Sequence, residues 1–417
     1  MECNLNKTII FLNLRFSDFY SKNLFKRVKE EVNVRFVAVL DQQFENQIGE
    51  HIAPYLDEIY YIPSQPKDGF LAEFEIKPLR SILENELKIT KNINIVCSDE
   101  FNLLNAGRLR REYGLAGHTD EELLLYRDKI KMKERLIQNG IRVPRFRLLQ
   151  KRDAYKKIRE EIGSVFIIKP LDSCGSHGIY PIHNENDFVQ FGIKSGNYSG
   201  SFEVEEFIQG DLYHVDSLVK SNVIEFICAN EYTCPNHDFT KGKVLGSIPL
   251  EENHPLCDRL IIFARKCLKT LGANNLVNHT ELFVTKDNEI IFLEISARPP
   301  GGLLNLTHNI NFGVNLMNED FFMQSGIHLD IESDKYNKYA FFAIFPLQAG
   351  TIVKLNNPKV NSRVDVTWHV KEGDFIYQEY CSNIVNKAAH AIFYNDNKNT
   401  LREDFEKIKQ HQSVEVT

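Results

Sequence analysis

Two glutamates near residue 290 have the types and spacing that most clearly suit chemistry. Glu281 lies in the segment NHTELF, and Glu294 follows the apolar run IIFL at the start of EISARPPGG. If the polar segment KDNE between them is a turn, the flanking strands are antiparallel and the glutamates can lie opposite each other. Two carboxylates about 4 Å apart repel by ~4 kcal/mol at an effective dielectric constant of about 20, and a divalent cation reverses that sign. The pair therefore predicts a Mg²⁺ site, and the alternative is two acids on an exposed hairpin face.

An arginine and a rigid turn follow the second glutamate. Arg298 lies four residues after Glu294 and directly precedes the segment 299–302, PPGG. Proline fixes the backbone φ angle, and glycine lets the backbone approach a ligand closely. A guanidinium beside a cation can hold phosphate oxygens in a bidentate manner. These residues favour a combined metal and anion site over an exposed hairpin.

The segment LDSCGSHGIY, residues 171–180, follows an apolar run that ends in IIKP. Its small residues and two glycines let successive backbone N–H groups surround a phosphate. It is not a Walker A loop, because GxxxxGK[ST] occurs nowhere in the chain. A plain hairpin turn is the alternative. Lys169, at the end of the apolar run, favours a phosphate, because a buried lysine is costly without an anionic partner.

The segment FEVEEFIQGDLYHVD, residues 202–216, is rich in acids. Strand alternation places Glu203, Glu205 and Phe207 on one face. Acids at the end of a strand could accept hydrogen bonds from the amino and hydroxyl groups of a nucleoside, and the backbone there could read an adenine edge. The alternative is a solvated edge strand.

Charge and cysteine usage limit the class of protein. The 417 residues carry a formal net charge of −7, which argues against a general nucleic-acid binder. Eight scattered cysteines without a CxxC pair indicate neither a zinc site nor a disulfide framework, and they favour a reducing cytoplasm. No stretch approaches the roughly 20 apolar residues of a membrane span. The apolar run near the N-terminus is short and broken by Asn13 and Arg15, so we interpret it as a strand and not as a signal peptide.

The elements that must position these residues begin with an alternating region over the first ~110 residues. The apolar segments KTIIFLNL, VRFVAVL, EIYYIP and NINIVC are separated by segments of helical spacing. Such a pattern is typical of a parallel sheet covered on both faces. No GxGxxG follows the first strand, so the dinucleotide-binding fingerprint is absent.

The pattern changes near residue 120. Residues 121–140, EELLLYRDKIKMKERLIQNG, predict one charged amphipathic helix that ends at Gly140. This helix contains Lys129, for which a solvated position is the alternative to a ligand contact. Strands are expected over 202–233 and 276–295, with a helix between them. A β-rich segment begins near residue 336 and ends in a late helix.

In their order along the chain, these segments resemble the ATP-grasp superfamily, and within it the carboxylate–amine ligases of the L-amino-acid ligase, or dipeptide synthetase, type. The matching segments are YRDKIKMKERLIQNGIRVP, FIIKPLDSCGSHGI, VEEFIQGDLYHVD, NHTELF and FLEISARPPGG. Each is weak alone, but five in this order across nearly the whole chain are specific. The resemblance implies an α/β chain of the ATP-grasp fold. It would have a Rossmann-like domain (residues 1–115), a small lobe with the Gly-rich loop (116–200), a metal- and substrate-binding lobe (201–330) and a C-terminal β-rich subdomain (331–417).

The resemblance also implies roles for individual residues. ATP contacts are expected from Lys129, Lys169, Ser173, Gly175, Ser176, Gly178, Glu205, Glu206, Phe207, Ile208 and Asp211. Within that set, the lysines and the loop Ser173–Gly178 would hold the phosphates, Glu205 or Glu206 the adenine and Asp211 the ribose. The Mg²⁺ ligands would be Glu281, Glu294 and Ser296, and the phosphoryl group would be bound by Arg298, Gly301 and Gly302. Ser296 stands where many family members have asparagine, and a hydroxyl group is a weaker ligand.

The activity implied by the resemblance is amide-bond formation between amino acids or similar acids. ATP would phosphorylate a carboxylate, and an amine would attack the acyl-phosphate. The expected partners are ATP, two Mg²⁺ ions (or Mn²⁺ in their place) and small-molecule carboxylates and amines, with no nucleic acid and no membrane, in a possible homodimer. His279 and His308 are candidate substrate contacts. The alternatives are an ATP-grasp carboxylase or purine-pathway ligase, and a non-catalytic nucleotide-binding module.

Overall fold

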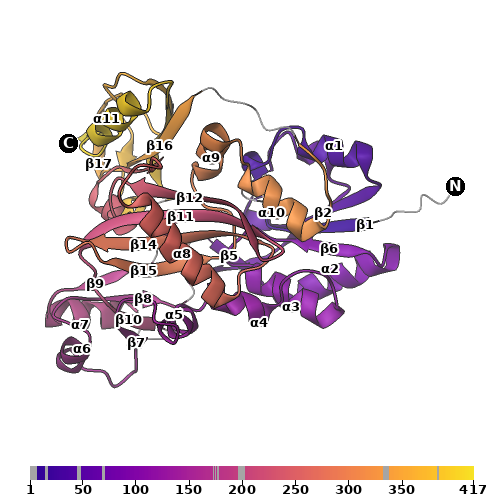
Figure 1. The fold of residues 1–417 in the computed structure, drawn as a ribbon, viewed down its shortest axis with the longest axis horizontal. Helices are drawn as coiled ribbons and strands as arrows, with labels where there is room; N and C mark the ends of the chain where they lie inside the picture. The colour runs from indigo at the N-terminus through magenta and orange to yellow at the C-terminus, as the bar shows by residue number, and fades with distance from the viewer. Residues whose placement is uncertain are drawn as a thin grey trace.

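The computed structural model describes residues 7–14, 17–44, 48–67, 71–171, 173, 175, 178–195, 202–331, 338–382 and 385–417. In Figure 1 an N-terminal α/β region lies at one end, a large central sheet follows, and a small lobe and a C-terminal region flank that sheet. No helix among these residues is long and apolar enough to cross a membrane.

The N-terminal region contains a four-stranded parallel sheet in the order β3-β2-β1-β6. Its strands and the helices around it are β1 (Lys7–Leu12), β2 (Val34–Asp41), β3 (Glu58–Ile62), β6 (Ile93–Val96), α1 (Leu24–Glu31), α2 (Ile76–Ile89) and α3 (Leu103–Tyr113). A short hairpin, β4 (Ser64–Lys67) with β5 (Leu71–Phe74), precedes α2. Helices α2 and α3 pack on one face of the sheet. On the other face α1 is joined by α10 (Leu316–Ser325), which comes from much later in the chain (Figure 1). The predicted parallel sheet with two covered faces is therefore confirmed.

The small lobe is an antiparallel sheet in the order β7-β10-β8-β9. Its elements are β7 (Phe146–Leu148), α6 (Tyr155–Glu161), β8 (Phe166–Pro170), β9 (Tyr180–Ile182), α7 (Glu185–Lys194) and β10 (Phe202–Glu206). Strand β10 pairs with a neighbour on each side. The solvated edge strand considered for residues 202–216 is therefore wrong, because β10 and the following strand, β11 (Gly210–Lys220), are each hydrogen-bonded to a neighbour on both sides.

The central sheet has eight antiparallel strands in the order β15-β14-β11-β12-β13-β16-β20-β18. They are β11 (Gly210–Lys220), β12 (Val223–Tyr232), β13 (Leu245–Pro249), β14 (Leu276–Thr285), β15 (Ile290–Ser296), β16 (Tyr339–Pro346), β18 (Arg363–Trp368) and β20 (Lys387–Asn395). Helix α8 (Cys257–Leu271) packs on one face against residues such as Val215 and Leu282. Because side chains alternate along a strand, His214, Asp216 and Glu281 face the opposite side.

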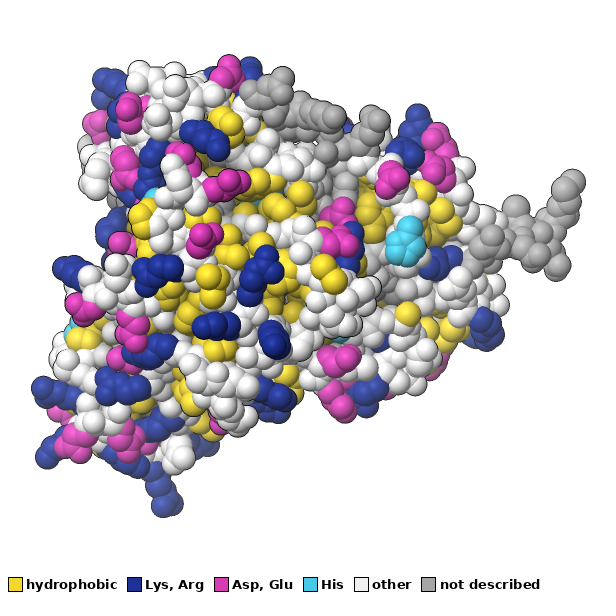
Figure 2. Space-filling view, in the orientation of Figure 1, with side chains coloured by type: hydrophobic (Ala, Val, Ile, Leu, Met, Phe, Trp, Pro, Cys, Tyr) yellow, Lys and Arg dark blue, Asp and Glu magenta, His cyan; other side chains and the backbone are white. Residues whose placement is uncertain are grey.

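The C-terminal β-rich segment contributes three strands to this large sheet, and the rest forms a separate three-stranded sheet. The remaining elements are β17 (Gly350–Leu355), β19 (Phe375–Ile376), α11 (Lys398–Ile408) and β21 (Val414–Val416). Helix α11 packs through Phe405 against Phe341 and Phe393. On the face in Figure 2, Lys and Arg side chains are interspersed with Asp and Glu side chains, so this face has no continuous basic surface.

The single helix predicted over residues 121–140 is wrong in its boundaries. The structure has α4 (Asp120–Leu123), a 3₁₀ helix (Leu124–Tyr126) and α5 (Lys129–Ile137). The break occurs because Asp128 is the N-cap of α5 and its carboxylate accepts hydrogen bonds from the next backbone N–H groups. Gly140 follows the helix with a φ of 69°, the left-handed conformation that a glycine at a helix end commonly adopts. Lys129 therefore begins a helix and does not lie in the middle of one.

Candidate active site

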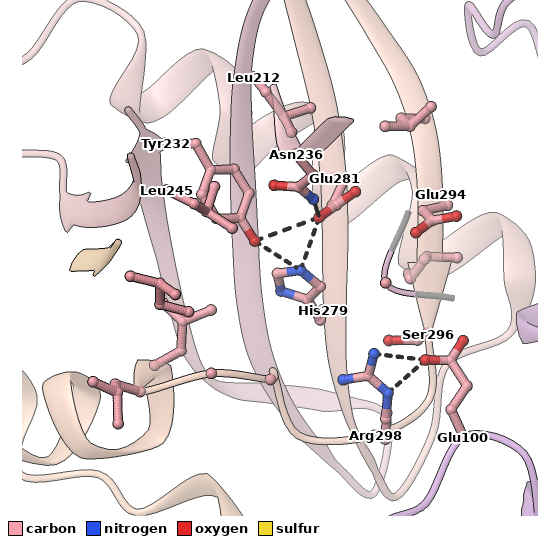
Figure 3. A pocket seen from close by; sticks show the side chains of 18 of the residues that line it. Glu100, Leu212, Tyr232, Asn236, Leu245, His279, Glu281, Glu294, Ser296 and Arg298 are labelled. Carbon is pink, nitrogen blue, oxygen red and sulfur yellow. Dashed lines mark hydrogen bonds and ion pairs between the residues drawn. The ribbon is translucent and has the colours of Figure 1, made fainter. Parts of the chain in front are cut away.

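A cavity of about 1740 Å³ is lined by the N-terminal region, the small lobe and the central sheet. Most of the predicted site residues lie on its wall, although they come from widely separated segments. They are Lys129, Lys169, Ser173, Gly175, Glu205, Glu206, Phe207, Ile208, Asp211, His279, Glu281, Glu294, Ser296, Arg298, Gly301 and Gly302. In Figure 3, Glu281, Glu294, Ser296 and Arg298 extend toward one shared space.

The hairpin of β14 and β15 places Glu281 and Glu294 directly opposite each other, with KDNE as the turn. Glu281 is buried, and its Oε1 accepts a hydrogen bond from Asn236 Nδ2 at 2.7 Å and lies 3.4 Å from the Tyr232 hydroxyl. Glu294 keeps 33% of its side chain exposed, with Oε2 3.5 Å from Lys129 Nζ. The alternative of two acids on an exposed hairpin face is wrong, because one of them is buried and held by donors.

These side chains fit Mg²⁺. Ser296 lies close by on β15, and its buried Oγ has no hydrogen-bond partner among the described residues. Burial alone would raise the pKa of Glu281, but His279 and Asn236 lower it below its usual value. The site therefore offers ionised carboxylate and hydroxyl oxygens, which are the ligand types that Mg²⁺ prefers together with substrate phosphates.

A buried charge cluster fixes Lys169. Its Nζ lies 2.9 Å from Glu205 Oε1 and 3.5 Å from Glu203 Oε1. Lys133 of α5 donates to both oxygens of Glu203 at 2.9 Å and also contacts Glu205. Burial lowers the pKa of Lys169, but Glu205 and Glu203 outweigh it and raise that pKa above its usual value. The lysine therefore stays charged on the cavity wall. Lys133 was not predicted, although its spacing of four from Lys129 places the two on one helix face.

Lys129 is only 6% exposed, so the alternative interpretation, that this lysine is solvated, is wrong. Its Nζ donates to the backbone carbonyl of Ser173 at 2.6 Å, besides lying near Glu294. Lys129 thus connects the Gly-rich segment with Glu294, one of the two opposed glutamates.

The Gly-rich segment connects the paired strands β8 and β9. Gly175 and Gly178 have φ angles of 62° and 69°, which favour glycine. Ser173 and Gly175 line the cavity, whereas Gly178 does not. The buried Oγ of Ser173 has no partner in the described part of the chain. The predicted contact Ser176 lies outside the described residues.

The segment between β10 and β11 forms another part of the wall. Glu206 accepts a hydrogen bond from the backbone N–H of Arg145 at 3.0 Å. Phe207 is 43% exposed, and Ile208 and Asp211 also face the cavity. Glu205 lies on the other side of the strand with the lysines, so the two acids considered for adenine have different surroundings.

Arg298 is held by a residue that the sequence analysis missed. Its Nε and Nη2 each lie 2.6 Å from Glu100 Oε2, and Arg127 Nη1 lies 2.5 Å from Glu100 Oε1. Burial alone would raise the pKa of Glu100, but Arg298 and Arg127 lower it to about 2. Figure 3 shows Glu100 and Arg298 side by side. The available signal was an acid four residues after the end of the parallel strand β6, at the edge where such sheets bind ligands.

The two candidate substrate histidines have different positions. His279 lines the cavity, with its Nε2 3.4 Å from Glu281 Oε1. The structure does not bring His308 to the cavity wall: it is fully buried, 3.1 Å from Asp216 and 3.4 Å from the sulfur of Cys228. Asp216, which the sequence analysis also missed, contacts both histidines.

The arrangement can bind a polyanion and neutralise charge that develops on it. Lys129 and Lys169 line the cavity, and so do Glu281 and Glu294, which lie opposite each other on paired strands. Arg298 lines the same cavity. Fixed charges of this kind stabilise a transferring phosphoryl group without reorganising during the reaction.

Comparisons with known proteins agree with this geometry. Residues 126–302 match the family described as ATP-grasp domain. The L-arginine-specific L-amino acid ligase of Bacillus subtilis is 23% identical over 362 residues, which cover 82% of this chain and 85% of that protein. The alanine–anticapsin ligase of Bacillus subtilis (strain 168) is 26% identical over 268 residues, 58% of this chain and 56% of that protein. Among solved structures, an L-amino acid ligase from Bacillus licheniformis has a TM-score of 0.71 at 14% identity, covering 99% of this chain and all of that one.

Proposed function

Residues 126–302 form an ATP-grasp domain and the chain has the ATP-grasp fold; from this premise we propose that it is an ATP-dependent carboxylate–amine ligase that joins amino acids or similar acids and releases ADP and phosphate. The named relatives support this proposal, since several are amino-acid ligases. One sequence-based alternative, a purine-pathway ligase, also has relatives among the matches. The curated one covers 46% of the chain, and the solved structures cover nearly all of it at TM-scores of 0.61 to 0.66, below the 0.71 of the L-amino acid ligase.

The reaction has two steps. A substrate carboxylate oxygen attacks the γ-phosphorus of ATP, the bond to the β–γ bridging oxygen breaks, and ADP leaves with the electron pair. The amine nitrogen then attacks the acyl carbon, the carbon–oxygen bond breaks, phosphate leaves, and the nitrogen loses a proton. Lys129 and Lys169 bind the phosphates in this scheme, and Arg298 orients the transferring group while Gly301 and Gly302 expose backbone N–H groups to it.

Mg²⁺ would be held by Glu281, Glu294 and Ser296, and when bound it supplies positive charge that reduces the repulsion between the carboxylate and the phosphates. We propose two ions, with Mn²⁺ as a substitute. Asn236 and Tyr232 hold Oε1 of Glu281 in place for this role.

The division into parts 1–115, 116–200, 201–330 and 331–417 remains a proposal, with ATP between the second and third parts. The homodimer and the cytoplasmic location also stay predictions. Light scattering on the purified chain tests whether it forms a homodimer.

The observation that carries the proposal is the opposed pair Glu281 and Glu294 beside Arg298 on one cavity wall. The test is a phosphate-release screen with ATP over all pairs of the twenty L-amino acids, with further carboxylic acids and bicarbonate as separate arms. Release that requires both a carboxylic acid and an amine supports a ligase. Release with bicarbonate alone would instead indicate a carboxylase, and no release with any acid would leave a non-catalytic module.

A further inference from the structure

A buried carboxylate lies behind the cavity wall and is surrounded by three histidines. Asp216 of β11 has no exposed surface. Its Oδ1 lies 2.6 Å from His279 Nδ1, and its Oδ2 lies 2.9 Å from His214 Nδ1 and 3.1 Å from His308 Nε2. A buried carboxylate is costly to desolvate, so this degree of pairing calls for an explanation.

One of the three contacts leads directly to the proposed metal site. His279 uses Nδ1 for Asp216, and its other nitrogen, Nε2, lies 3.4 Å from Glu281 Oε1. A ring held at both nitrogens has one orientation. Because the same Oε1 is also approached by Asn236 and Tyr232, the carboxylate plane of Glu281 is fixed from behind. Oxygen Oε2 is then the one aimed at a cation between Glu281 and Glu294.

A second contact leads to the phosphoryl-binding turn. His308 belongs to α9 (Leu304–Phe312), the helix that follows the Arg298–Gly302 segment. Asn305 of the same helix donates to the carbonyl of Pro300 at 2.8 Å. Asp216 therefore contacts one side chain that reaches the metal carboxylate and another on the helix that anchors the turn.

We propose that Asp216 is a positioning residue that acts through His279 to orient Glu281 as a metal ligand, and through His308 to set α9 and its turn at the matching distance. This inference rests on the proposed function, because it assigns Glu281 to the cation. Partners of this kind around a ligand typically change metal affinity by about 10- to 100-fold when they are removed.

The same side chains could instead hold a metal ion themselves. Asp216 with His214 and His279, or Asp216 with Cys228 and His308, bring ligand-type atoms within 4.8 Å of one another. Three observations favour positioning. The Asp216–His279 pair already has the geometry of a hydrogen bond, His279 is shared with Glu281, and the other nitrogen of His308, Nδ1, has no partner among the described residues. A ligating histidine normally donates that second nitrogen to a partner.

The test compares two substitutions at one cluster. Asp216→Asn keeps the shape but removes the charge and one acceptor, so the His279 ring loses its fixed orientation. Asn230→Ala is the matched control, because Asn230 Nδ2 lies 3.4 Å from Asp216 Oδ2 but has no hydrogen bond or ion pair with His279 or Glu281 among the described residues. The readout is Mn²⁺ binding by electron paramagnetic resonance in the presence of a non-hydrolysable ATP analogue, which needs no turnover. Thermal unfolding is followed for each variant.

The expected result is at least tenfold weaker Mn²⁺ binding in Asp216→Asn, with Asn230→Ala within twofold of the parent. If Asp216→Asn does not fold, His279→Gln interrupts the same path and should weaken Mn²⁺ binding equally. Unchanged Mn²⁺ binding in the folded Asp216→Asn variant, or equal weakening in Asn230→Ala, would overturn the inference. Stoichiometric zinc in the purified parent that is lost in Asp216→Asn would overturn it in favour of a buried metal site. A parent that binds analogue and Mn²⁺ normally but joins no substrates would contradict the proposed function and leave this comparison valid.

Discussion

Arg298 is the residue whose chemistry is least replaceable. Two of its guanidinium nitrogens already hold one carboxylate oxygen of Glu100, so the planar fork is fixed on the cavity wall that it shares with Glu281 and Glu294. A lysine presents a single point charge and cannot keep that geometry while meeting a phosphoryl group. The side chain is therefore anchored on the cavity wall, where its Nη1 also donates to the backbone carbonyl of Pro299 at 2.8 Å.

Arg298→Lys should lower turnover by about 10²- to 10³-fold, the usual cost of one preorganised donor. The affinity for ATP should change much less, because the arginine acts mainly in the transition state. Steady-state kinetics with calorimetric ATP titration separates the two effects. Turnover within about twofold of the parent, in a variant with an unchanged thermal midpoint, would show that Arg298 has a different role.

Lys169→Met should weaken ATP binding by roughly 10- to 100-fold, because the substitution keeps the length of the side chain but removes a charge-assisted contact to phosphate. Glu205 keeps Lys133 as a partner, so the fold should survive. Calorimetry with an ATP analogue measures the effect. Lys131→Met, on the exposed face of α5, is the control and should bind as the parent does. Equal affinity in Lys169→Met and the control would remove Lys169 from the site.

Among the elements, α5 sets the position of Lys129 on the cavity wall. The helix begins at Lys129 because the Asp128 carboxylate accepts hydrogen bonds from the N–H groups of Ile130 and Lys131. The cap thus fixes both the start of the helix and the direction of Lys129 toward Ser173. A continuous helix, as the periodicity suggests, would have left this lysine in a different register.

Asp128→Ala should lower the free energy of unfolding by about 1 kcal/mol through loss of the cap. It should also raise the KM for ATP, because the first turn that carries Lys129 frays. Thr119→Ala removes the capping box of α4 and provides the control. The control should lose similar stability without a change in KM. A KM for ATP that shifts equally in both variants would assign the effect to stability alone.

Across the whole molecule, Glu100 joins the N-terminal region to the central sheet through Arg298. The pKa of Glu100 falls from 4.5 to about 2 in the folded chain. Burial raises this pKa, but the two arginines lower it by more. A carboxyl group whose pKa is lower in the folded chain than in the unfolded chain stabilises the fold at pH values above its unfolded pKa. This stability is lost as the pH falls from about 4.5 toward 2. The full contribution is about 3 kcal/mol at neutral pH.

Glu100→Gln should therefore be less stable than the parent at pH 7, and the difference should shrink as the pH falls below 4.5. Urea unfolding at several pH values between 7 and 3.5 measures it. A difference that stays constant or grows over this range would contradict the assignment of the low pKa to Glu100.

Local patterns in the sequence could predict the parallel N-terminal sheet and the opposed position of the two site glutamates. The opposition of Glu281 and Glu294 follows from a four-residue turn, and the parallel N-terminal sheet follows from its continuous apolar strands. The burial of Glu203 and Glu205 could not be predicted, because strand alternation does not distinguish a central strand from an edge strand. The break before Lys129 was missed because an N-cap aspartate resembles any other charged residue of a helix.

The partners of the site residues could not be predicted because they lie far away in sequence. Glu100 reaches Arg298 across 198 residues, and Asp216 reaches His279 across 63. Neither pair has a local signal that links its members: Glu100 and Arg298 follow strands of different sheets, and Asp216 and His279 lie opposite each other on neighbouring strands of one sheet. Long-range ion pairs of this kind therefore require the tertiary structure.

The central claim is that a substrate carboxylate is phosphorylated in the cavity beside Glu281, Glu294 and Arg298. The most direct test uses a carboxylic acid substrate labelled with ¹⁸O in both carboxyl oxygens, under single-turnover conditions with ATP and the amine found in the screen. Mass spectrometry of the released phosphate should show one ¹⁸O per molecule, because the carboxylate oxygen leaves with the phosphoryl group. Unlabelled phosphate formed together with the amide product would contradict the account.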